Sequence, residues 1–108
     1  MTGFPPKVRK IVAERSGGYC EGCGYHRADQ IHHRRPRGMG GSSAADTNTA
    51  SNALALCYGC HTGVESRRQS AEIYGWLVPQ GFSPRDRPVL RRGDWVLLDD
   101  DGAVIPYE

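Results

Sequence analysis

The chain lacks any long apolar run. No stretch of its 108 residues approaches the roughly twenty apolar residues that cross a bilayer, and no apolar segment follows the charge near the N-terminus, as a secretion signal would require. It also has no internal repeat and no long low-complexity block. We therefore expect one domain, located in the cytoplasm rather than secreted, with no membrane partner.

Apolar residues are scarce overall. They make up 38% of the chain, while fourteen residues are glycine. A domain of this size then buries little apolar surface against a large loss of backbone entropy. The sequence predicts that a covalent or metal cross-link stabilises the fold.

Only four cysteines are present, and they form two tight pairs, Cys20-x-x-Cys23 and Cys57-x-x-Cys60. Two such pairs can close a tetrahedral four-thiolate site with no open position, which is typical of structural zinc. Two disulfides would need an oxidising compartment, and a redox-active pair would need a thioredoxin-like setting that the sequence lacks. The sequence therefore predicts a structural Zn²⁺ bound by all four cysteines.

The net charge of +2 is too small to indicate a binding partner by itself, but the charged residues are unevenly distributed along the chain. The first forty residues hold eight arginines and lysines against three acidic residues, whereas acidic residues gather toward the C-terminus. Most charges simply lie on solvated surfaces. A basic half that also contains the metal-type residues nevertheless favours a phosphate backbone as partner.

The pattern of apolar, glycine and proline residues predicts an α+β fold. Proline at the start and two glycines at the end bound a helix over 5–16. Strands are expected over 28–35 and 52–57, joined by a loop over 37–51 and followed by a helix over 60–75. A connector then leads to a hairpin of 95–98 with 103–105 around Asp101-Gly102.

Three of the four histidines lie close to the cysteine pairs. His32 and His33 are adjacent on an expected strand, and His61 directly follows Cys60. Adjacent strand residues point to opposite sides, so the pair could serve two purposes, one on a metal and one on a water. The fourth histidine, His26, has no companion pattern and is interpreted as a surface residue.

Taken in order, these motifs resemble the HNH endonuclease family. The similarity covers roughly residues 17–77. It rests on Cys20-x-x-Cys23, Ile31-His32-His33-Arg34-Arg35-Pro36, Gly40-Gly41-Ser42, Asn52-Ala-Leu-Ala-Leu-Cys57-x-x-Cys60-His61 and Gly75-Trp76-Leu77. The resemblance implies a ββα-metal (His-Me finger) nuclease core over residues 1–78, with 79–108 as a connector and hairpin extension of the same domain.

The resemblance also implies roles for individual residues. His32 and His61 correspond to ligands of a catalytic divalent ion, and His33 corresponds to the general base. Asn52 corresponds to the residue that ties down the loop between the strands and keeps the base oriented. Many relatives carry a further histidine one helical turn after His61, where this chain has Glu65.

Glu65 leaves the third metal ligand open. It lies four residues after His61, on the same helical face, and a carboxylate can bind a metal. It could equally be a surface charge that pairs with Arg68 or Gln69. Oxygen ligands favour Mg²⁺ or Mn²⁺, with Ni²⁺ or Zn²⁺ as alternatives.

The implied activity is hydrolysis of DNA phosphodiester bonds to 5′-phosphate and 3′-hydroxyl ends, by nicking or double-strand cleavage. Arg34, Arg35 and Arg37 lie beside the expected base and are predicted to contact the nucleic-acid backbone. Small relatives occur in phages and bacteria, which implies a bacterial cytoplasm, a link to genome packaging and a phage or host partner protein. The alternatives are a zinc-containing nucleic-acid-binding module without catalysis and an assembly protein; the oligomeric state stays open.

Overall fold

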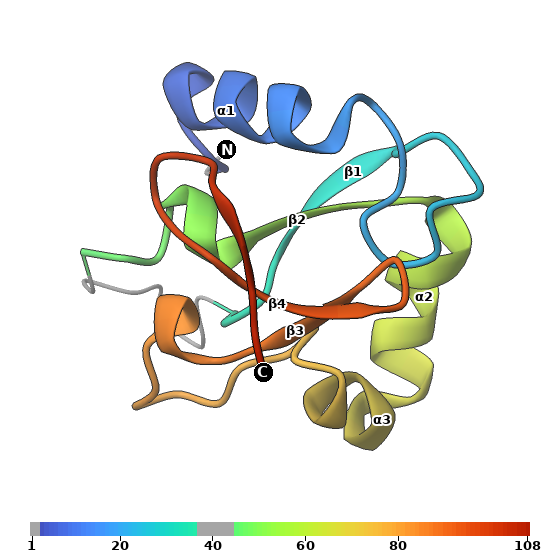
Figure 1. The fold of residues 1–108 in the computed structure, drawn as a ribbon. Helices are drawn as coiled ribbons and strands as arrows, with labels where there is room; N and C mark the ends of the chain where they lie inside the picture. Colours follow the sequence, from blue (N-terminus) through green and yellow to red (C-terminus); the bar gives the residue numbers. More distant parts are fainter. Residues whose placement is uncertain (1–2, 37–44) are drawn as a thin grey trace.

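The computed structural model describes residues 3–36 and 45–108. It is an α+β fold with two small sheets (Figure 1). No helix in these two ranges is long and apolar enough to span a membrane. The elements, in order, are α1 (Pro6–Ser16), β1 (Gln30–His33), the short 3₁₀ helix η1 (Ala50–Asn52), β2 (Ala53–Leu56), α2 (Tyr58–Ser66), α3 (Arg68–Ile73), the 3₁₀ helix η2 (Pro84–Asp86), β3 (Val89–Arg91), β4 (Asp94–Leu98) and β5 (Val104–Pro106).

Helix α1 occupies the predicted position. Pro6 starts it, where a missing backbone N–H has no cost, and Gly17 ends it in the left-handed region with φ of 67°. The N–H of Gly17 then bonds to the carbonyl oxygen of Ala13 at 2.9 Å. The helix lies over the β1–β2 hairpin, with Val12 fully buried between them.

Strands β1 and β2 pair antiparallel, with His32 opposite Leu54 and His33 opposite Ala53. Both strands are shorter than predicted, and β2 begins only at Ala53 because residues 50–52 form the 3₁₀ turn η1. Every residue of β2 is buried, so both faces of this hairpin are covered. Because side chains alternate along a strand, β2 divides the core into two apolar clusters.

The two clusters have different neighbours. The smaller cluster lies on the α1 side of the hairpin and is formed by Phe4, Val12, Ala53 and Ala55. The larger one contains Leu54, Leu56, Cys20, Cys57, Val64, Ala71, Leu77, Val89, Val96 and Leu98. The larger cluster therefore joins the cysteine pairs, α2, α3 and the C-terminal sheet in one core.

The prediction of a single helix over 60–75 is wrong. Two helices, α2 and α3, meet at Arg67, whose φ of −134° and ψ of 60° lie outside the helical region. Neither glycine nor proline stands at the break, so local propensity does not explain it. Tertiary contacts hold α3 instead, because the carbonyl oxygen of Tyr74 accepts from Leu90 N and the indole of Trp76 donates to Leu90 O.

The C-terminal sheet has strand order β3-β4-β5, all antiparallel. The hairpin of β4 and β5 lies where the sequence predicts it. Strand β3 was not expected, since three residues after Pro88 carry too little pattern to identify a strand. Val89 and Val96 place this sheet against the larger cluster rather than apart from it.

A buried carboxylate connects three elements beneath the first cysteine pair. Glu21 is fully buried and forms ion pairs with Arg15 of α1 at 2.7 Å and with Arg91 of β3 at 2.8 Å. It also accepts from the N–H of Ala55 at 3.0 Å. Burial by itself would raise the pKa of the Glu21 carboxyl. The hydrogen bond from Arg15 and the positive charge of Arg15 outweigh burial, so the pKa of Glu21 lies below its usual range.

Candidate functional site

The four cysteine sulfurs converge at one point. Their Sγ atoms all lie within 4.8 Å of one another, and Cys23 Sγ is 4.0 Å from Cys57 Sγ. A tetrahedral zinc site with Zn–S bonds of about 2.3 Å separates its sulfurs by about 3.8 Å. This cluster could therefore bind a structural metal ion such as Zn²⁺.

Backbone N–H groups surround these sulfurs. Cys20 Sγ accepts from the N–H groups of Gly22 at 3.3 Å and Cys23 at 3.4 Å, and Cys57 Sγ accepts from Cys60 N at 3.5 Å. Cys57 also caps the N-terminus of α2, where the helix dipole favours negative charge. These hydrogen bonds favour the thiolate form of the two accepting sulfurs, although burial raises the pKa of Cys57.

The thiols do not ionise independently of one another. Burial raises the pKa of Cys20, but backbone hydrogen bonds at Cys57, Cys23 and Gly22 outweigh burial and lower it to about 7. Burial raises the pKa of Cys60, and the charge at Cys20 raises it further. Four thiolates in so small a volume repel one another, so a divalent cation fits the donor set.

His32 lies on the α2 side of the hairpin. It is buried, and its Nε2 lies 2.8 Å from the carbonyl oxygen of Trp76. A carbonyl only accepts, so Nε2 carries the hydrogen and Nδ1 keeps a lone pair. Burial lowers the pKa of His32 to about 4, aided by the charges of His61 and His33, so this imidazole is neutral near pH 7.

His61, another predicted ligand, lies beside His32. Its ring centroid lies 5.3 Å from that of His32, in an edge-to-face arrangement. Glu65 follows one turn later but is exposed and pairs with Arg68 at 3.2 Å. Within residues 3–36 and 45–108, the cysteine cluster is the one group of three or more potential ligands that converges. The structure thus brings His32 and His61 together without Glu65.

His33 lies on the opposite side of the hairpin from His32. Its ring stacks on Phe4, with centroids 4.0 Å apart and an interplanar angle of 18°. Its Nε2 lies 2.8 Å from Oδ1 of Asn48, a residue in the loop before η1. Sequence reasoning missed both partners, since one aromatic ring near the terminus and one asparagine in a polar loop give no local signal.

Asn52 is fully buried, and its partners among the described residues are backbone groups. Its Oδ1 accepts from Arg35 N at 2.7 Å, and its Nδ2 donates to the carbonyl oxygens of Thr47 at 2.8 Å and Arg35 at 3.2 Å. These bonds tie the end of β1 to the loop that precedes η1. The asparagine side chain that hydrogen-bonds to His33 is that of Asn48, not Asn52.

Arg34 is not on the surface, and its burial contradicts the prediction that it contacts a nucleic-acid backbone. It is 0% exposed, and burial lowers its pKa to about 9, which still leaves it charged at neutral pH. Its guanidinium donates to four backbone carbonyls, those of Gly75, Ser51, Pro84 and Arg87, at 2.9–3.0 Å. Arg34 therefore joins the segments around the site and is not accessible to DNA.

Arg35 is also buried, and only 6% of it is exposed. Its guanidinium pairs with Asp46 and donates to the carbonyl oxygen of Phe82. The expectation of a backbone contact therefore does not fit Arg35 either. Arg37, the third predicted contact, and the motif Gly40-Gly41-Ser42 lie outside the described residues.

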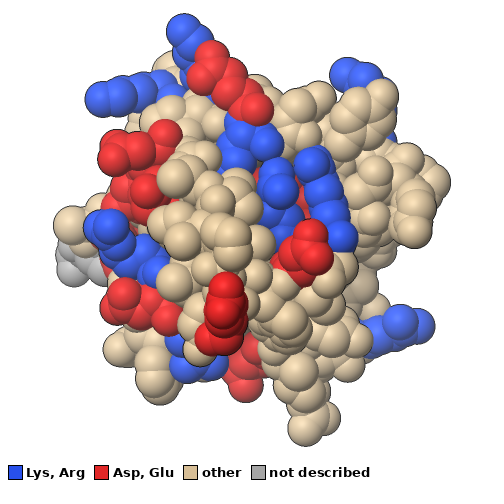
Figure 2. Space-filling view, viewed as in Figure 1, with Lys and Arg blue, Asp and Glu red and all other residues tan. Residues whose placement is uncertain are grey.

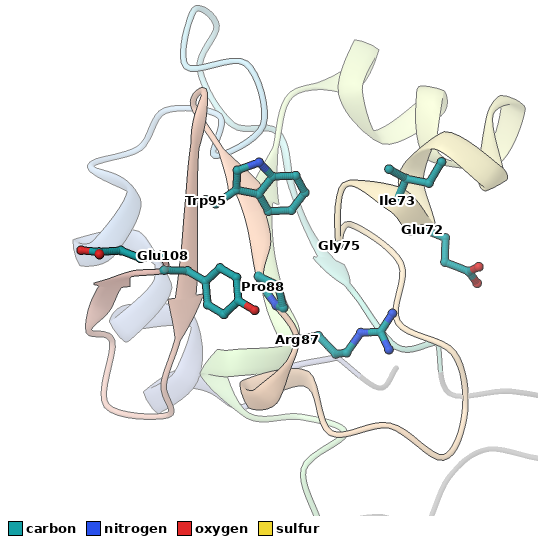
Figure 3. A pocket seen from close by; sticks show the side chains of 8 residues that line it. Glu72, Ile73, Gly75, Arg87, Pro88, Trp95 and Glu108 are labelled. Carbon is teal, nitrogen blue, oxygen red and sulfur yellow. The ribbon is translucent and has the colours of Figure 1, made fainter.

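Neither the visible surface charge nor the largest cavities identify a binding face. On the face drawn in Figure 2, basic and acidic side chains are interspersed. One cavity of about 610 Å³ lies between the end of α3 and the C-terminal sheet, lined by side chains such as Ile73, Arg87 and Trp95 (Figure 3). No histidine or cysteine is among the residues that line it, so this cavity is not part of the site formed by the predicted histidines and cysteines.

Comparison with protein-family models, with curated proteins and with solved structures finds no match to this chain. The functional argument therefore depends on the sequence motifs and on the geometry of the site.

Proposed function

We propose that this chain is a metal-dependent HNH endonuclease with a ββα-metal core, formed by β1, β2 and α2. It would hydrolyse DNA phosphodiester bonds and leave 5′-phosphate and 3′-hydroxyl ends. A structural Zn²⁺ on the four cysteines would hold the first knuckle against the start of α2.

One observation carries the proposal: the β1–β2 hairpin carries two of the predicted histidines, and α2 places the third beside one of them. His32 and His33 leave β1 on opposite sides, and His61 lies on α2 beside His32. Asn52 ties the loop between the strands to the end of β1. A zinc module without catalysis has no need of a neutral, buried His32 next to another imidazole.

The chain's own groups support the chemistry of phosphodiester hydrolysis. The imidazole of His33 is half-buried, is fixed on one face by Phe4 and can accept a proton from water. His32 keeps a lone pair on Nδ1, because Nε2–H is donated to Trp76. These features suit a proton acceptor and a metal ligand on neighbouring residues.

His32 and His61 would hold the catalytic divalent ion, with Glu65 as the third candidate ligand. The two imidazoles fit, because they are adjacent and His32 is neutral. The ion pair between Glu65 and Arg68 is exposed and therefore weak. It would do little to prevent Glu65 from turning toward a bound ion. When bound, Mg²⁺ or Mn²⁺ would supply Lewis-acid stabilisation of the phosphate charge.

Contacts to the DNA backbone would come from exposed cations rather than from Arg34 or Arg35. Arg68 is exposed beside Glu65 and lines a small cavity of about 250 Å³ together with Pro36 and Gln80. Arg37 follows Pro36 directly in the chain. Such contacts are electrostatic and carry no base sequence.

The second candidate function is nucleic-acid binding without catalysis. It is favoured by one observation, that Glu65 does not converge with His32 and His61. A binder with only structural zinc would retain DNA affinity and lack cleavage under every added metal.

Plasmid cleavage distinguishes the two functions. The zinc-loaded protein is freed of loosely bound metal and assayed with Mg²⁺, Mn²⁺, Ni²⁺ or Zn²⁺ added back, beside His33→Ala and His26→Ala. We expect cleavage that depends on the added ion, is abolished in His33→Ala and is retained in His26→Ala, whose side chain is exposed and is not part of the motif. Binding without cleavage under all four ions would favour the non-catalytic module.

A further inference from the structure

The hydrogen bond between His33 and Asn48 determines which nitrogen of His33 can act. Nε2 of His33 lies 2.8 Å from Oδ1 of Asn48. An amide oxygen only accepts hydrogen bonds, so Nε2 carries the hydrogen and Nδ1 keeps the lone pair. If the amide were rotated so that its nitrogen faced the ring, the opposite tautomer would form.

The ring of His33 is also held on its face. Phe4 stacks against it at 4.0 Å, and Phe4 is itself only 3% exposed, packed in the smaller cluster under α1. The backbone of His33 is fixed by its pairing with Ala53 in the hairpin. One face and one edge of the imidazole, together with the backbone of His33, are thus restrained.

Asn48 is well placed to hold that edge, because the residues on both sides of it are anchored. The carbonyl oxygen of Thr47 accepts from the buried Asn52 amide at 2.8 Å. The hydroxyl of Thr49 donates to the carbonyl oxygen of Asp46 at 3.0 Å. Asn52 therefore acts on His33 only through the loop, and Asn48 makes the direct contact.

We propose that Asn48 is the positioning residue of the catalytic base, holding His33 in its Nε2–H tautomer so that Nδ1 accepts the proton of the attacking water. The inference rests on the proposed nuclease function for its catalytic part. Its structural part, the tautomer and its hydrogen bond, can be tested without any cleavage.

The structural part is tested by NMR on zinc-loaded, ¹⁵N-labelled protein under alkaline conditions, where imidazoles are neutral. We expect long-range ¹H–¹⁵N correlations of His33 to show the Nε2–H tautomer, with an Hε2 resonance protected from exchange. Protection should persist in Asn48→Asp, which keeps an accepting oxygen, and disappear in Asn48→Ala. The exposed His26 supplies the unprotected comparison in the same spectra. An Nδ1–H tautomer, or protection unchanged in Asn48→Ala, would overturn the inference.

The catalytic part is tested by steady-state cleavage kinetics of the same variants. Loss of the partner that orients a catalytic histidine is expected to lower kcat about tenfold to a hundredfold with KM little changed, and Asn48→Asp should recover most of the rate. Gln69→Ala, which removes an exposed amide from α3, should match the native enzyme.

The outcomes separate the two proposals. Cleavage by Asn48→Ala at the native kcat would contradict a positioning role, even with the tautomer as expected. Absence of cleavage by the native protein would refute the proposed function, while the spectra of His33 would still decide whether Asn48 holds its ring.

Discussion

His32 donates its Nε2 hydrogen to the carbonyl oxygen of Trp76 across 2.8 Å. The indole of the same Trp76 donates to Leu90 O and packs against Gly22 in the first cysteine knuckle. One residue thus contacts the candidate metal ligand His32, the C-terminal sheet and the cysteine cluster. The position of His32 therefore depends on the packing of the cysteine-containing part of the fold.

Gly22 tests this packing. A Cβ at Gly22 would lie 2.9 Å from Trp76 Cη2 and 3.3 Å from Cys60 Sγ, so Gly22→Ala should destabilise the protein by about 1–3 kcal/mol through overpacking. Gly59→Ala is the matched control, because a Cβ there meets nothing within 4 Å and alanine favours helix α2. Urea denaturation of both variants measures the difference. Equal stability would show that Trp76 does not restrict the knuckle.

Removal of one cysteine should weaken the whole core. Cys57 belongs to the larger cluster and caps α2, so Cys57→Ser would remove a candidate metal ligand from the centre of the fold. We expect one zinc per native chain by elemental analysis, and a loss of more than about 3 kcal/mol in the variant, which lowers Tm by about 10 °C or more. Chelator added to the native protein should reproduce the loss. A native protein that contains no metal and ignores chelator would contradict the zinc site.

Arg34 should be needed for folding rather than for DNA binding. Arg34→Met leaves four backbone carbonyls without their donor, so we expect a loss of at least about 3 kcal/mol in the free energy of unfolding. Arg68→Met is the control, since Arg68 is exposed and its removal should change stability by about 0.5 kcal/mol or less. If Arg34→Met folded with native stability and bound DNA less tightly, the result would support the original prediction that Arg34 contacts the nucleic-acid backbone.

Stability should fall in acid partly through Asp100. Burial alone raises the pKa of Asp100, but hydrogen bonds from Ser51 and Thr49 and the charge of Arg85 outweigh it, so that pKa lies below its usual range. A carboxyl with a lowered pKa stabilises the fold above its unfolded pKa, and the stabilisation is lost as pH falls through the lower, folded value. Asp100→Asn should therefore show a smaller drop in Tm than the native protein between about pH 6 and pH 3.

The exposed Asp101, in the same turn, supplies the control for this pH effect. Asp101→Asn should follow the native dependence of Tm on pH. An Asp100→Asn profile that coincides with the native one would show that the contact with Ser51 contributes nothing to acid sensitivity.

Features set by neighbouring residues could be predicted from the sequence. The proline start and glycine end of α1, the two Cys-x-x-Cys knuckles and the β4–β5 hairpin all depend on short-range preferences of a few residues. The α+β class followed from the same local patterns. The opposite orientation of His32 and His33 followed from the alternation of side chains along a strand.

Other features depended on contacts between distant segments. An arginine next to a histidine pair looks like a phosphate contact, and only the closure of four segments around Arg34 shows that it is buried. The break at Arg67 and strand β3 have no local signal; Leu90 of β3 hydrogen-bonds to Tyr74 and Trp76, which directly follow α3.

The sequence by itself determined which chemical groups are available, where the two cysteine knuckles lie and roughly where α1, β1, β2 and the β4–β5 hairpin lie, because those properties depend on residue type and short-range spacing. Only the tertiary structure decided which partner each group has: Trp76 for His32, and Asn48 with Phe4 for His33. The physical reason is that a hydrogen bond or a ring stack depends on distances of a few ångströms between groups that lie up to 44 positions apart in the chain.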